Sequence, residues 1–337
     1  MEKSWFVRTY RDNDKNEILE LLGFSRQLWE WYASNPYGYL IGLAECKSSK
    51  KIVGYMALTL THIKIANETK QGSLAIELFV HPDFRRQGMF LAIGRFITTK
   101  AMEENIAVSL GFPNRFAHRG HLKYGWFNVT EISMFKRYAS FKGFMMSRGI
   151  LPKVNFIYHK VFHRRKQIDE GIKIKQVSSF GPEIDKLWKS IAKHYDLLVV
   201  RNLKYLNWRF IAKPNSTYQV FVAQKNEKIL GYAVVFVKDT PRKKIGYIVD
   251  LFAHPNPSII HSLVSHSIKC LKEQKADVIL CGLLAKKPFY QVLRNNSFFP
   301  SYKIPLIARI NTKETDIAKD YLKNYEKWYV TLGDSDL

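Results

Sequence analysis

The sequence contains an internal repeat. Four segments of its first half recur in the same order in the second half, at spacings of 172 to 177 residues. The pairs are 78–82 (LFVHP) with 251–255 (LFAHP), 52–55 (IVGY) with 229–232 (ILGY), Trp31 with Trp208, and the apolar runs around Ser109 and Cys281. Similarity at a nearly constant spacing indicates two copies of one fold. We therefore predict copies over about 1–140 and 172–312, which gives domains 1–140 and 172–337 with a connector, 141–171, between them.

Length and composition agree with two folded domains. Of the 337 residues, 46% are hydrophobic and 14% aromatic, which suffices for a core in each copy and excludes a disordered chain. No apolar stretch reaches the ~18 residues of a transmembrane helix, and the first residues lack the apolar core of a secretion signal. Cys46, Cys270 and Cys281 are far apart and odd in number, so neither disulfides nor a zinc site are expected. These features predict a cytoplasmic protein without a metal.

The charge is strongly positive, with 53 Lys and Arg against 29 Asp and Glu and a formal net charge of +24. Such a charge favours polyanionic partners, including nucleic acid, anionic lipid and phosphorylated substrates. The densest basic runs are 163–166 (HRRK) and 242–244 (RKK), and no zinc-finger, RNA-binding or basic heptad pattern accompanies them. No specific nucleic-acid partner is therefore expected, and a solvated basic surface is the simpler interpretation.

The connector mixes aromatic with basic residues, as in Phe156, Tyr158, Lys160 and Arg164. This mixture is typical of a segment that lies on a membrane surface, and also of one that packs its aromatic side chains between two domains. We favour packing and keep a peripheral contact with the inner face of a membrane as the alternative.

Hydrophobic periodicity predicts the same order of elements in both copies. In the first copy it gives a helix over 14–34, strands over 40–45, 52–65 and 74–80, a helix over 90–104, a strand over 106–110 and a helix over 115–124. In the second it gives helix 182–194, strands 219–224, 229–237 and 245–252, helix 258–273, strand 277–281 and helix 287–296. This order predicts a mixed α/β fold, in which helices flank a mostly antiparallel central sheet in each copy.

The junction between the strand that ends at Val80 and the helix that follows has features of a phosphate site. Pro82 ends the strand, and Gly88 permits a tight turn in which the backbone can approach a ligand closely. The free N–H groups of the first helical turn suit a pyrophosphate, and Arg85 and Arg86 add positive charge. An ordinary glycine turn with solvated arginines is the alternative.

Residues 80–90 resemble motif A of the GNAT superfamily, the acetyl-CoA-dependent N-acetyltransferases. The pattern Q/R-x-x-G-x-G/A is filled by Arg85, Gly88 and Phe90, of which Phe90 departs from the usual small residue. Residues 109–126 are similar to the closing part of the family's fold, with Asn114 at the start of the last helix and Tyr124 before a Gly-aromatic pair. The resemblance covers 1–135 directly and 172–312 through the repeat, and it implies tandem GNAT-like domains that use acetyl-CoA as cosubstrate.

The second copy lacks the elements of the phosphate site. Asn256 and Pro257 follow its LFAHP segment, without a glycine or an arginine, and Pro257 removes an amide donor. We therefore predict one acetyl-CoA site per chain, in the first copy. The degenerate second copy would shape the acceptor pocket or brace the first domain.

The resemblance also implies roles for single residues. The Val80 N–H is our choice for the donor to the oxyanion, and Tyr124 matches the tyrosine that protonates the departing thiolate, with a core aromatic as the alternative. The cofactor-binding set that it implies is Leu78, Phe79, Val80, Arg85, Arg86, Gln87, Gly88, Met89, Phe90 and Asn114.

Three side chains are candidates for the general base that takes the proton of the amine. Strand alternation places Glu77 on the same face as Phe79, where it is either the base or a buried ion-pair partner. His118 and His121 on the last helix of the first copy are the rival bases, with plain surface histidines as the alternative.

The acceptor is less well defined by the sequence. Tyr205, Trp208 and Arg209 combine aromatic faces with a fork-shaped donor, which suits a sugar or a phosphate, and an interdomain plug is the alternative. Residues 328–336 resemble the ending of GNAT-like proteins associated with bacterial surface-polysaccharide assembly, which implies an amino-sugar acceptor. The rival hypotheses are a protein or peptide amine as acceptor, a non-catalytic binder of nucleic acid or membrane, and an aminoacyl transferase that uses charged tRNA.

Overall fold

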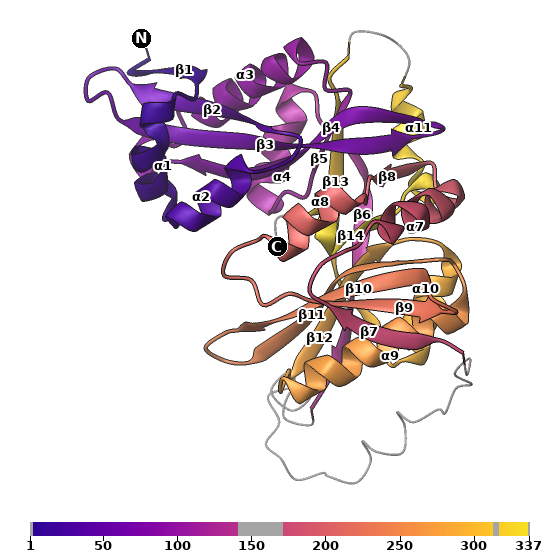
Figure 1. The fold of residues 1–337 in the computed structure, drawn as a ribbon. Coiled ribbons are helices and arrows are strands. Elements are labelled where there is room, and N and C mark those ends of the chain that lie inside the picture. Colours follow the sequence, from indigo (N-terminus) through magenta and orange to yellow (C-terminus); the bar gives the residue numbers. More distant parts are fainter. Residues whose placement is uncertain (1–2, 141–170, 313–316, 336–337) are drawn as a thin grey trace.

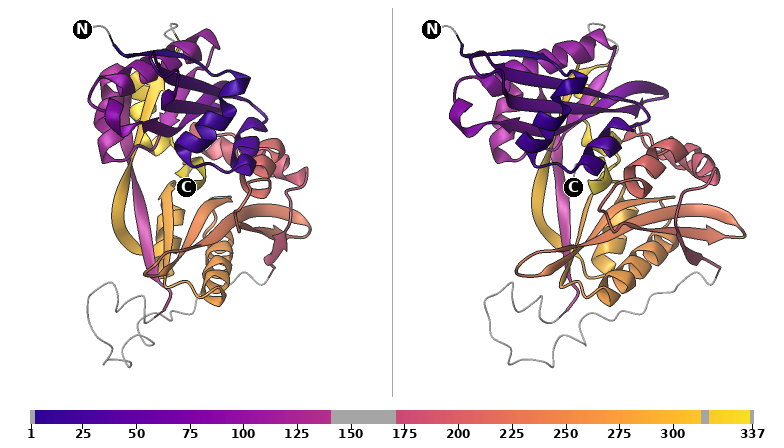
Figure 2. Two further views of the ribbon diagram at one scale, coloured as in Figure 1. Left: turned by 90° about the vertical axis from the view of Figure 1, so that its left-hand side faces the viewer. Right: turned by 60° about the vertical axis from the view of Figure 1, so that its left-hand side comes forward.

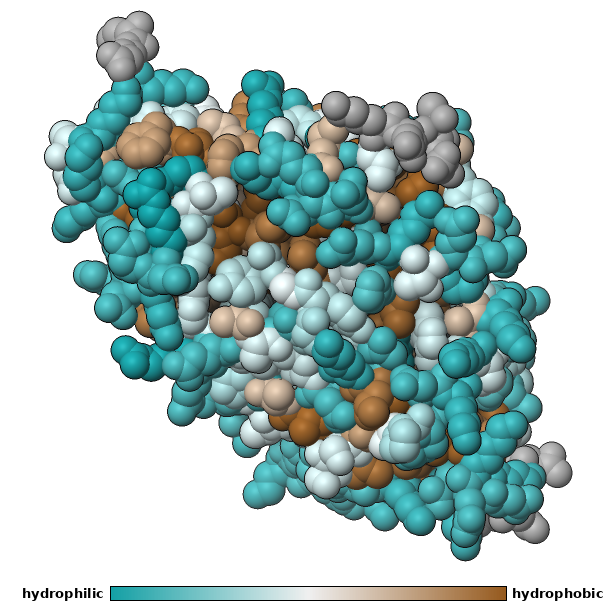
Figure 3. Space-filling model, turned by 45° about the horizontal axis from the view of Figure 1, so that its top comes forward, coloured by the Kyte–Doolittle hydropathy of each residue, from teal (hydrophilic) through white to brown (hydrophobic). Residues whose placement is uncertain are grey.

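The computed structural model describes residues 3–140, 171–312 and 317–335, so the predicted connector lies almost wholly outside the described residues. Figure 1 shows two halves, one above the other, each with a sheet between helices. The described strands form one 14-stranded sheet that continues through both halves. On the face drawn in Figure 3, hydrophobic side chains lie in recesses ringed by hydrophilic ones. No described helix is long and apolar enough to cross a bilayer.

The first half begins the sheet with the order β1-β2-β3-β4-β5. All neighbouring pairs are antiparallel except β4 with β5, which are parallel. Helix α3 covers one face and α1 with α2 the other, each over its own hydrophobic cluster. The elements are β1 (Trp5–Thr9), α1 (Lys15–Leu22), α2 (Arg26–Ala33), β2 (Tyr39–Cys46), β3 (Ile52–Ile65), β4 (Glu68–Val80), α3 (Met89–Glu103), β5 (Val108–Gly111), α4 (Arg115–His121) and β6 (Phe127–Tyr138).

The second half repeats this order. The elements are β7 (Lys173–Val177), α7 (Glu183–Ile191), β8 (Leu197–Val199), α8 (Leu203–Leu206), β9 (Gln219–Lys225), β10 (Lys228–Asp239), β11 (Lys244–Ala253), α9 (Pro257–Glu273), β12 (Val278–Leu284), α10 (Lys287–Asn295), β13 (Phe299–Ile310), α11 (Lys319–Lys323) and β14 (Val330–Thr331). Here β11 and β12 are the parallel pair, in the place of β4 and β5.

The structure corrects one predicted helix. Residues 14–34 form two helices, because Gly23 ends α1 in the left-handed conformation at φ +64°. The hydroxyl of Ser25 then accepts a hydrogen bond from the Leu28 N–H and starts α2. The bend lets both helices lie on the same face of the sheet. Six described strands have no counterpart among the predicted elements: β1, β6, β7, β8, β13 and β14.

The two halves exchange their last long strands. Strand β13 of the second half pairs with β5 of the first, and β6 of the first half pairs with β12 of the second. The exchanged strands also pair with each other, and Figure 2 shows them running from one half into the other. A boundary at residue 140 therefore divides the sequence into two copies. In the structure, however, each copy contributes one strand to the sheet of the other.

The repeated tryptophans meet between the halves. The Trp31 and Trp208 rings stack with centroids 4.8 Å apart and planes 7° from parallel. Each indole N–H donates to the other residue's carbonyl oxygen, at 2.7 Å from Trp31 and 2.8 Å from Trp208. Such reciprocal contacts between equivalent positions are the mark of a two-fold interface, here between the two copies in one chain.

Candidate active site

Strands β4 and β5 separate at the centre of the first half. They pair only along Gly72 to Ala75 of β4. Beyond Ala75, β4 stays paired with β3, but no described strand pairs with its other edge. The register between β3 and β4 skips Glu77, which forms a β-bulge and has a φ of +33°. A positive φ is uncommon for a residue other than glycine and marks local strain of the kind found at functional sites.

The bulge corrects the predicted side-chain pattern of β4. Ile76 and Phe79 pack on the face covered by α1 and α2, whereas Leu78 and Val80 pack against α3. Because Glu77 is the extra residue, strict alternation fails here. Glu77 nevertheless acts electrostatically on Tyr55, which packs in the same cluster as Phe79, so a face shared by Glu77 and Phe79 stays a prediction.

The free edge of β4 presents backbone donors to the gap. The His81 N–H donates to the Val53 carbonyl at 2.8 Å, so His81 and Phe79 are the residues that bond to β3. In an antiparallel ladder the intervening residues point the opposite way. The N–H groups of Leu78 and Val80 therefore face the gap left by β5, as an oxyanion or pantetheine donor must.

This gap opens into a groove of about 990 Å³ between β4, the turn before α3, and α4. It is lined by most of the predicted cofactor-binding residues: Leu78, Phe79, Val80, Arg85, Arg86, Gly88, Met89, Phe90 and Asn114. Glu77 and His121 line it as well, whereas Gln87, His118 and Tyr124 do not. The groove thus brings together residues that the sequence predicted from three separate segments.

The turn into α3 has the backbone geometry of an anion site. Arg86 and Gly88 both adopt the left-handed conformation, at φ +62° and +78°. Gly88 is the N-cap of the 15-residue helix α3, whose first N–H groups open toward the groove. A Cβ on Gly88 would meet no atom within 4 Å, so the requirement for glycine is conformational rather than steric. The Arg85 Nε donates to the Val80 carbonyl at 3.2 Å and fixes the turn to the end of β4.

Two glycines allow α3 and α4 to pack closely beside the groove. A Cβ on Gly120 would lie 2.4 Å from the Phe90 ring, and one on Gly94 would lie 2.5 Å from the Tyr124 ring. The bulky Phe90 thus fills the space that Gly120 leaves open. This pairing explains how the chain carries a phenylalanine where the resembled motif has a small residue.

Tyr124 is a buried residue that lies behind the groove wall, in contact with the lining residues Met56, Phe90 and His121. Its side chain is 6% exposed, and its hydroxyl is hydrogen-bonded to Nδ1 of His121. Burial raises the pKa of the Tyr124 phenol, and burial together with His118 lowers the pKa of His121 to about 4. At neutral pH the phenol is therefore the donor, and the imidazole proton stays on Nε2. Tyr124 does not line the groove, and its predicted role as the acid that protonates the thiolate stays a prediction.

The other polar candidates beside the groove have local partners. The Asn114 side chain caps α4 by accepting hydrogen bonds from the N–H groups of Phe116 and Ala117, both at 3.0 Å. The His118 Nε2 lies 2.6 Å from the Asn128 Oδ1, away from the groove, so His118 is not at the site as predicted. Gln87 donates from Nε2 to the Asp83 carbonyl at 3.1 Å.

The predicted acceptor-binding cluster in the second half is buried. Tyr205, Trp208 and Arg209 are 2%, 7% and 4% exposed and lie outside the groove. Trp208 stacks on Trp31, and Arg209 donates to the carbonyls of Gly333, at 3.2 Å, and Ser335. The acceptor role is therefore wrong for these three residues, and the alternative of an interdomain plug is the one that fits.

The corresponding gap of the second copy is filled by the chain itself. Strand β14 pairs with β12 where β12 leaves β11, and the Tyr329 hydroxyl donates to the Leu251 carbonyl. Leu251, Phe252 and Ala253, which match Leu78, Phe79 and Val80, are at most 1% exposed. Among the described residues, the edge of β11 that corresponds to the free edge of β4 is therefore covered by the chain itself.

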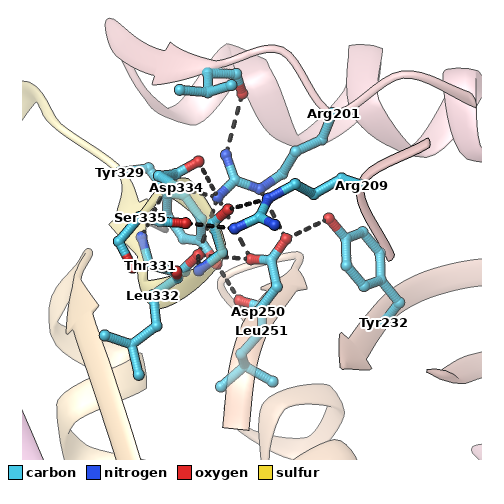
Figure 4. Close-up of polar contacts among 12 residues, drawn as sticks. Arg201, Arg209, Tyr232, Asp250, Leu251, Tyr329, Thr331, Leu332, Asp334 and Ser335 are labelled. Carbon is cyan, nitrogen blue, oxygen red and sulfur yellow. Dashed lines mark hydrogen bonds and ion pairs between the residues drawn. The ribbon is translucent and has the colours of Figure 1, made fainter. Parts of the chain in front are cut away.

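A buried ionic network fastens this plug (Figure 4). Arg201 contacts Asp250 at 3.2 Å and Asp334 at 2.8 Å, with all three side chains at most 2% exposed. Tyr232 and Thr331 donate to Asp250, each at 2.8 Å. Asp250 occupies the position that matches Glu77 in the repeat, and in the second copy this position carries a buried ion pair.

Several groove residues were missed by the sequence analysis. Met56 and Phe112 line the apolar inner part, and Phe116 and Lys123 line the outer part. Phe116 is 90% exposed, a rare state for a phenylalanine, but nothing in the sequence distinguishes it from a buried one. Within the described residues no group of three or more His, Cys, Asp or Glu side chains is placed to hold a metal.

Comparison with known proteins defines the fold. No protein-family model and no curated protein matches the sequence. A conserved protein of Enterococcus faecalis described as a probable N-acyltransferase superposes with a TM-score of 0.66 at 12% identity, covering 91% of this chain and 73% of that one. N-myristoyltransferase of Saccharomyces cerevisiae with bound myristoyl-CoA gives 0.64 at 12% identity, over 97% and 89%. A GCN5-related N-acetyltransferase of Anabaena variabilis gives 0.63 at 13%, over 91% and 73%.

These similarities, together with the repeated α/β halves and the gap between β4 and β5, place the chain among proteins of the GNAT fold. Its particular form is the tandem arrangement of the N-myristoyltransferases, with two GNAT-like units in one chain. The predicted fold class is confirmed. At these identities the likeness concerns the fold, and the chemistry is argued from the groove.

Proposed function

We propose that the protein is an acyl-CoA-dependent N-acyltransferase, with acetyl-CoA as donor and a primary amine as acceptor. The observation that carries this proposal is the free edge of β4 at Leu78 and Val80, which leads directly to the left-handed turn at Arg86 and Gly88. One continuous groove thus offers amide donors to a thioester and to a pyrophosphate. Few ligands other than an acyl-CoA carry both groups.

The residues of the groove fit such a donor. The N–H groups that follow Gly88, at the positive end of α3, would hold the pyrophosphate, with Arg85 and Arg86 beside them. The edge of β4 would hold the pantetheine amides, and the Asn114 amide nitrogen would donate to the same arm. The bound donor supplies a thioester, a carbonyl activated for attack by an amine.

Acyl transfer forms a C–N bond to the acceptor and breaks the C–S bond of the thioester. The Val80 N–H would stabilise the negative charge on the carbonyl oxygen during attack. Glu77, at the bulge, lines the groove and would take the proton of the amine, directly or through water. The departing thiolate takes up one proton, and the proton that Glu77 has accepted from the amine would supply it through water, so that the reaction leaves Glu77 ionised again. His121, held by Tyr124, would hydrogen-bond to the thiolate from the groove wall.

The lining of the groove bears on the acyl group, and the charge of the chain bears on the acceptor. The inner groove is apolar, with Met56, Ile76 and Phe112 among its lining residues, and the similar yeast enzyme binds myristoyl-CoA, so a longer acyl chain is the second candidate. For the acceptor we propose an amino sugar of a surface glycan, whose phosphate-bearing carrier would suit the charge of +24. A peptide amine is the second candidate acceptor.

A thiol-release assay tests the proposal. Acetyl-, butyryl-, octanoyl- and myristoyl-CoA are each offered with a panel of amino sugars and peptide amines, and free CoA is measured. We expect release that depends on one acceptor class and is highest with acetyl-CoA. A maximum at a longer chain would replace acetyl by that acyl group. Absence of both acyl-CoA binding and turnover would reject the enzyme and leave the non-catalytic alternative.

A further inference from the structure

One face of the sheet in the second half carries aromatic rings and cations in two rows. Strand pairing sets the first row across β10, β11, β12, β6 and β13, and this row consists of Phe236, Tyr247, Leu280, Lys136 and Phe299. The second row, two residues away on the first four of these strands, consists of Lys238, Ile245, Val278 and Tyr138. Because paired residues share a face and side chains alternate along a strand, both rows point to the same side. We call these nine residues the aromatic face.

The aromatic face points away from the helix that covers the other side of the sheet. A Cβ on Gly246 in β11 would lie 3.1 Å from the Leu271 side chain of α9, and the residues on either side of Gly246 belong to the aromatic face. Phe299 is 36% exposed. Tyr302 of β13 extends the face, since it acts electrostatically on Tyr247 and is 50% exposed. Exposed ring surface gathered in one place marks an interaction site.

Contacts among the rings hold the aromatic face in order. The rings of Phe236 and Tyr247 stack with centroids 4.9 Å apart and planes 10° from parallel. The ring centroids of Tyr138 and Phe299 are 5.4 Å apart. The Lys136 Nζ lies over both of the latter rings, 5.0 Å from the centroid of Tyr138 and 5.4 Å from that of Phe299. The face is therefore an ordered apolar layer with a cation set into it.

The hairpin between β10 and β11 brings further positive charge to one side of the aromatic face. It projects from the second half (Figure 1), and Arg242 and Lys243 at its tip are exposed. The one carboxylate of the hairpin, that of Asp239, pairs with Lys244 at 3.4 Å. The tip therefore keeps a net positive charge.

The sequence that adjoins the aromatic face has a charge of the same sign. The described chain leaves this face at Ser140, two residues after Tyr138, and residues 141–170 carry seven Lys and Arg against two Asp and Glu. The Ser140 hydroxyl donates to Asp277 at 3.2 Å, and this carboxylate is buried. A partner of the aromatic face thus meets a positive surrounding, which complements an anionic surface.

We propose that the aromatic face and the β10–β11 hairpin bind the surface of a lipid bilayer that contains anionic phospholipids. This inference goes beyond the proposed function and does not depend on it. Tyrosine and lysine side chains combine an apolar body with a polar tip, which suits the boundary between headgroups and acyl chains. The cations of the hairpin pair with lipid phosphates. Five strands at a spacing of about 4.8 Å make a face about 19 Å wide for this contact.

Two other ligands fit the aromatic face less well. A sugar is oriented by polar groups such as carboxylates and amides, and none of the nine side chains carries either group. A nucleic acid stacks its bases on free ring faces. Here Phe236 and Tyr247 stack on each other, and Lys136 lies over the rings of Tyr138 and Phe299. The observations therefore favour the bilayer.

Co-sedimentation with vesicles tests the inference on the full chain. The vesicles consist of phosphatidylcholine alone or with about 30% phosphatidylglycerol. The aromatic variant is Phe299→Ser/Tyr302→Ser. Its control, Phe6→Ser/Tyr325→Ser, changes the same residue types at matched exposure, 38% and 54% against 36% and 50%.

A second pair of variants tests the charge. The charge variant is Lys238→Gln/Arg242→Gln/Lys243→Gln, and its control, Lys173→Gln/Lys175→Gln/Lys186→Gln, removes three cations from β7 and α7. All the substituted side chains in both pairs are exposed, so the hydrophobic core stays unchanged in each variant. A single-stranded RNA is titrated into the same set of proteins.

We expect the wild type to bind the vesicles with phosphatidylglycerol at least about tenfold more tightly than those without it, and the charge variant to lose at least about tenfold. The aromatic variant should lose at least about fivefold on the same vesicles, because its rings no longer enter the headgroup boundary. Both controls should stay within about twofold of the wild type. No binding to the anionic vesicles, or equal losses in the variants and their controls, would overturn the inference. An unchanged affinity of the aromatic variant would overturn the role of the face, and RNA bound more tightly than the vesicles and lost in the same variants would assign the face to nucleic acid instead.

Discussion

Among single residues, the pair of Tyr124 and His121 shows how burial assigns chemical roles beside the groove. Both side chains are buried, at 6% and 5% exposure, but only His121 lines the groove. The phenol is kept protonated because burial raises its pKa, and its hydrogen bond to Nδ1 keeps the imidazole proton on Nε2. Tyr124 is thus a positioning residue for His121.

The lowered pKa of His121 predicts a dependence of stability on pH. In the unfolded chain this histidine has a pKa of 6.5, and in the folded protein burial and His118 lower it to about 4. Between these values the unfolded state binds the proton and the folded state does not, so stability falls as the pH drops from 6.5 to 4. When the pH drops from 7 to 5, we expect the free energy of unfolding to fall by about 2 kcal/mol less in His121→Gln than in the wild type, as measured by urea unfolding. Identical losses in the two proteins would show that His121 titrates normally.

The sequence predicted most of the residues that line the groove, but it did not predict the backbone bulge on β4 or which side chains are buried. The turn at Gly88 and the residues on β4 could be predicted because glycine, proline and arginine mark such a turn locally. The bulge at Glu77 could not, because a positive φ at a glutamate depends on the divergence of β4 from β5 and has no local signal. For the same reason, burial of Trp208 and exposure of Phe116 depend on contacts between distant segments.

Among the secondary-structure elements, the two parallel strand pairs show why one copy has an open groove beside its central strand and the other does not. The gap between β4 and β5 is open, whereas the gap between β11 and β12 holds β14 and the Tyr329 side chain. The sequence predicted a degenerate second copy from the loss of glycine and arginine after its LFAHP segment. The plug itself could not be predicted, because it comes from a segment about 80 residues further along the chain.

The buried ionic network makes the plug sensitive to substitution. Asp250→Ala would remove one of the two carboxylates that contact the Arg201 guanidinium, which is 1% exposed. We expect a loss of about 3 kcal/mol in the free energy of unfolding, since removing one partner of a buried pair typically costs 3–5 kcal/mol and Asp334 remains. Asp239→Ala, where the carboxylate is mostly exposed and pairs with Lys244 at 3.4 Å, is the control and should cost less than about 0.5 kcal/mol. Similar losses in both variants would mean that the network contributes little.

For the whole molecule, the exchange of β6 and β13 makes the halves interdependent. Without β13, strand β5 loses a neighbour that it bonds through four residue pairs, and without β6, strand β12 loses six. The internal repeat predicted two copies, but their exchange is a property of pairing between distant strands, which periodicity within each strand does not reveal.

This interdependence predicts the behaviour of fragments. Fragments 1–140 and 171–337, produced separately, should each lack a cooperative thermal transition, because each exposes an unpaired strand edge and an unpaired tryptophan. Mixing them should restore a transition and one-to-one association, followed by circular dichroism and light scattering. A sharp transition in fragment 1–140 alone would show that the first copy is an independent domain.

The central claim is that one acyl-CoA site exists per chain and that the turn at Gly88 forms it. Calorimetric titration of coenzyme A into the wild type, Gly88→Asp and Gly88→Asn tests it most directly. Both side chains tolerate the left-handed conformation and meet no atom within 4 Å at Cβ, but only aspartate places a negative charge beside the pyrophosphate. We predict one site per chain, at least tenfold weaker in Gly88→Asp and within threefold of the wild type in Gly88→Asn. Two equivalent sites, or binding that Gly88→Asp leaves unchanged, would contradict the account.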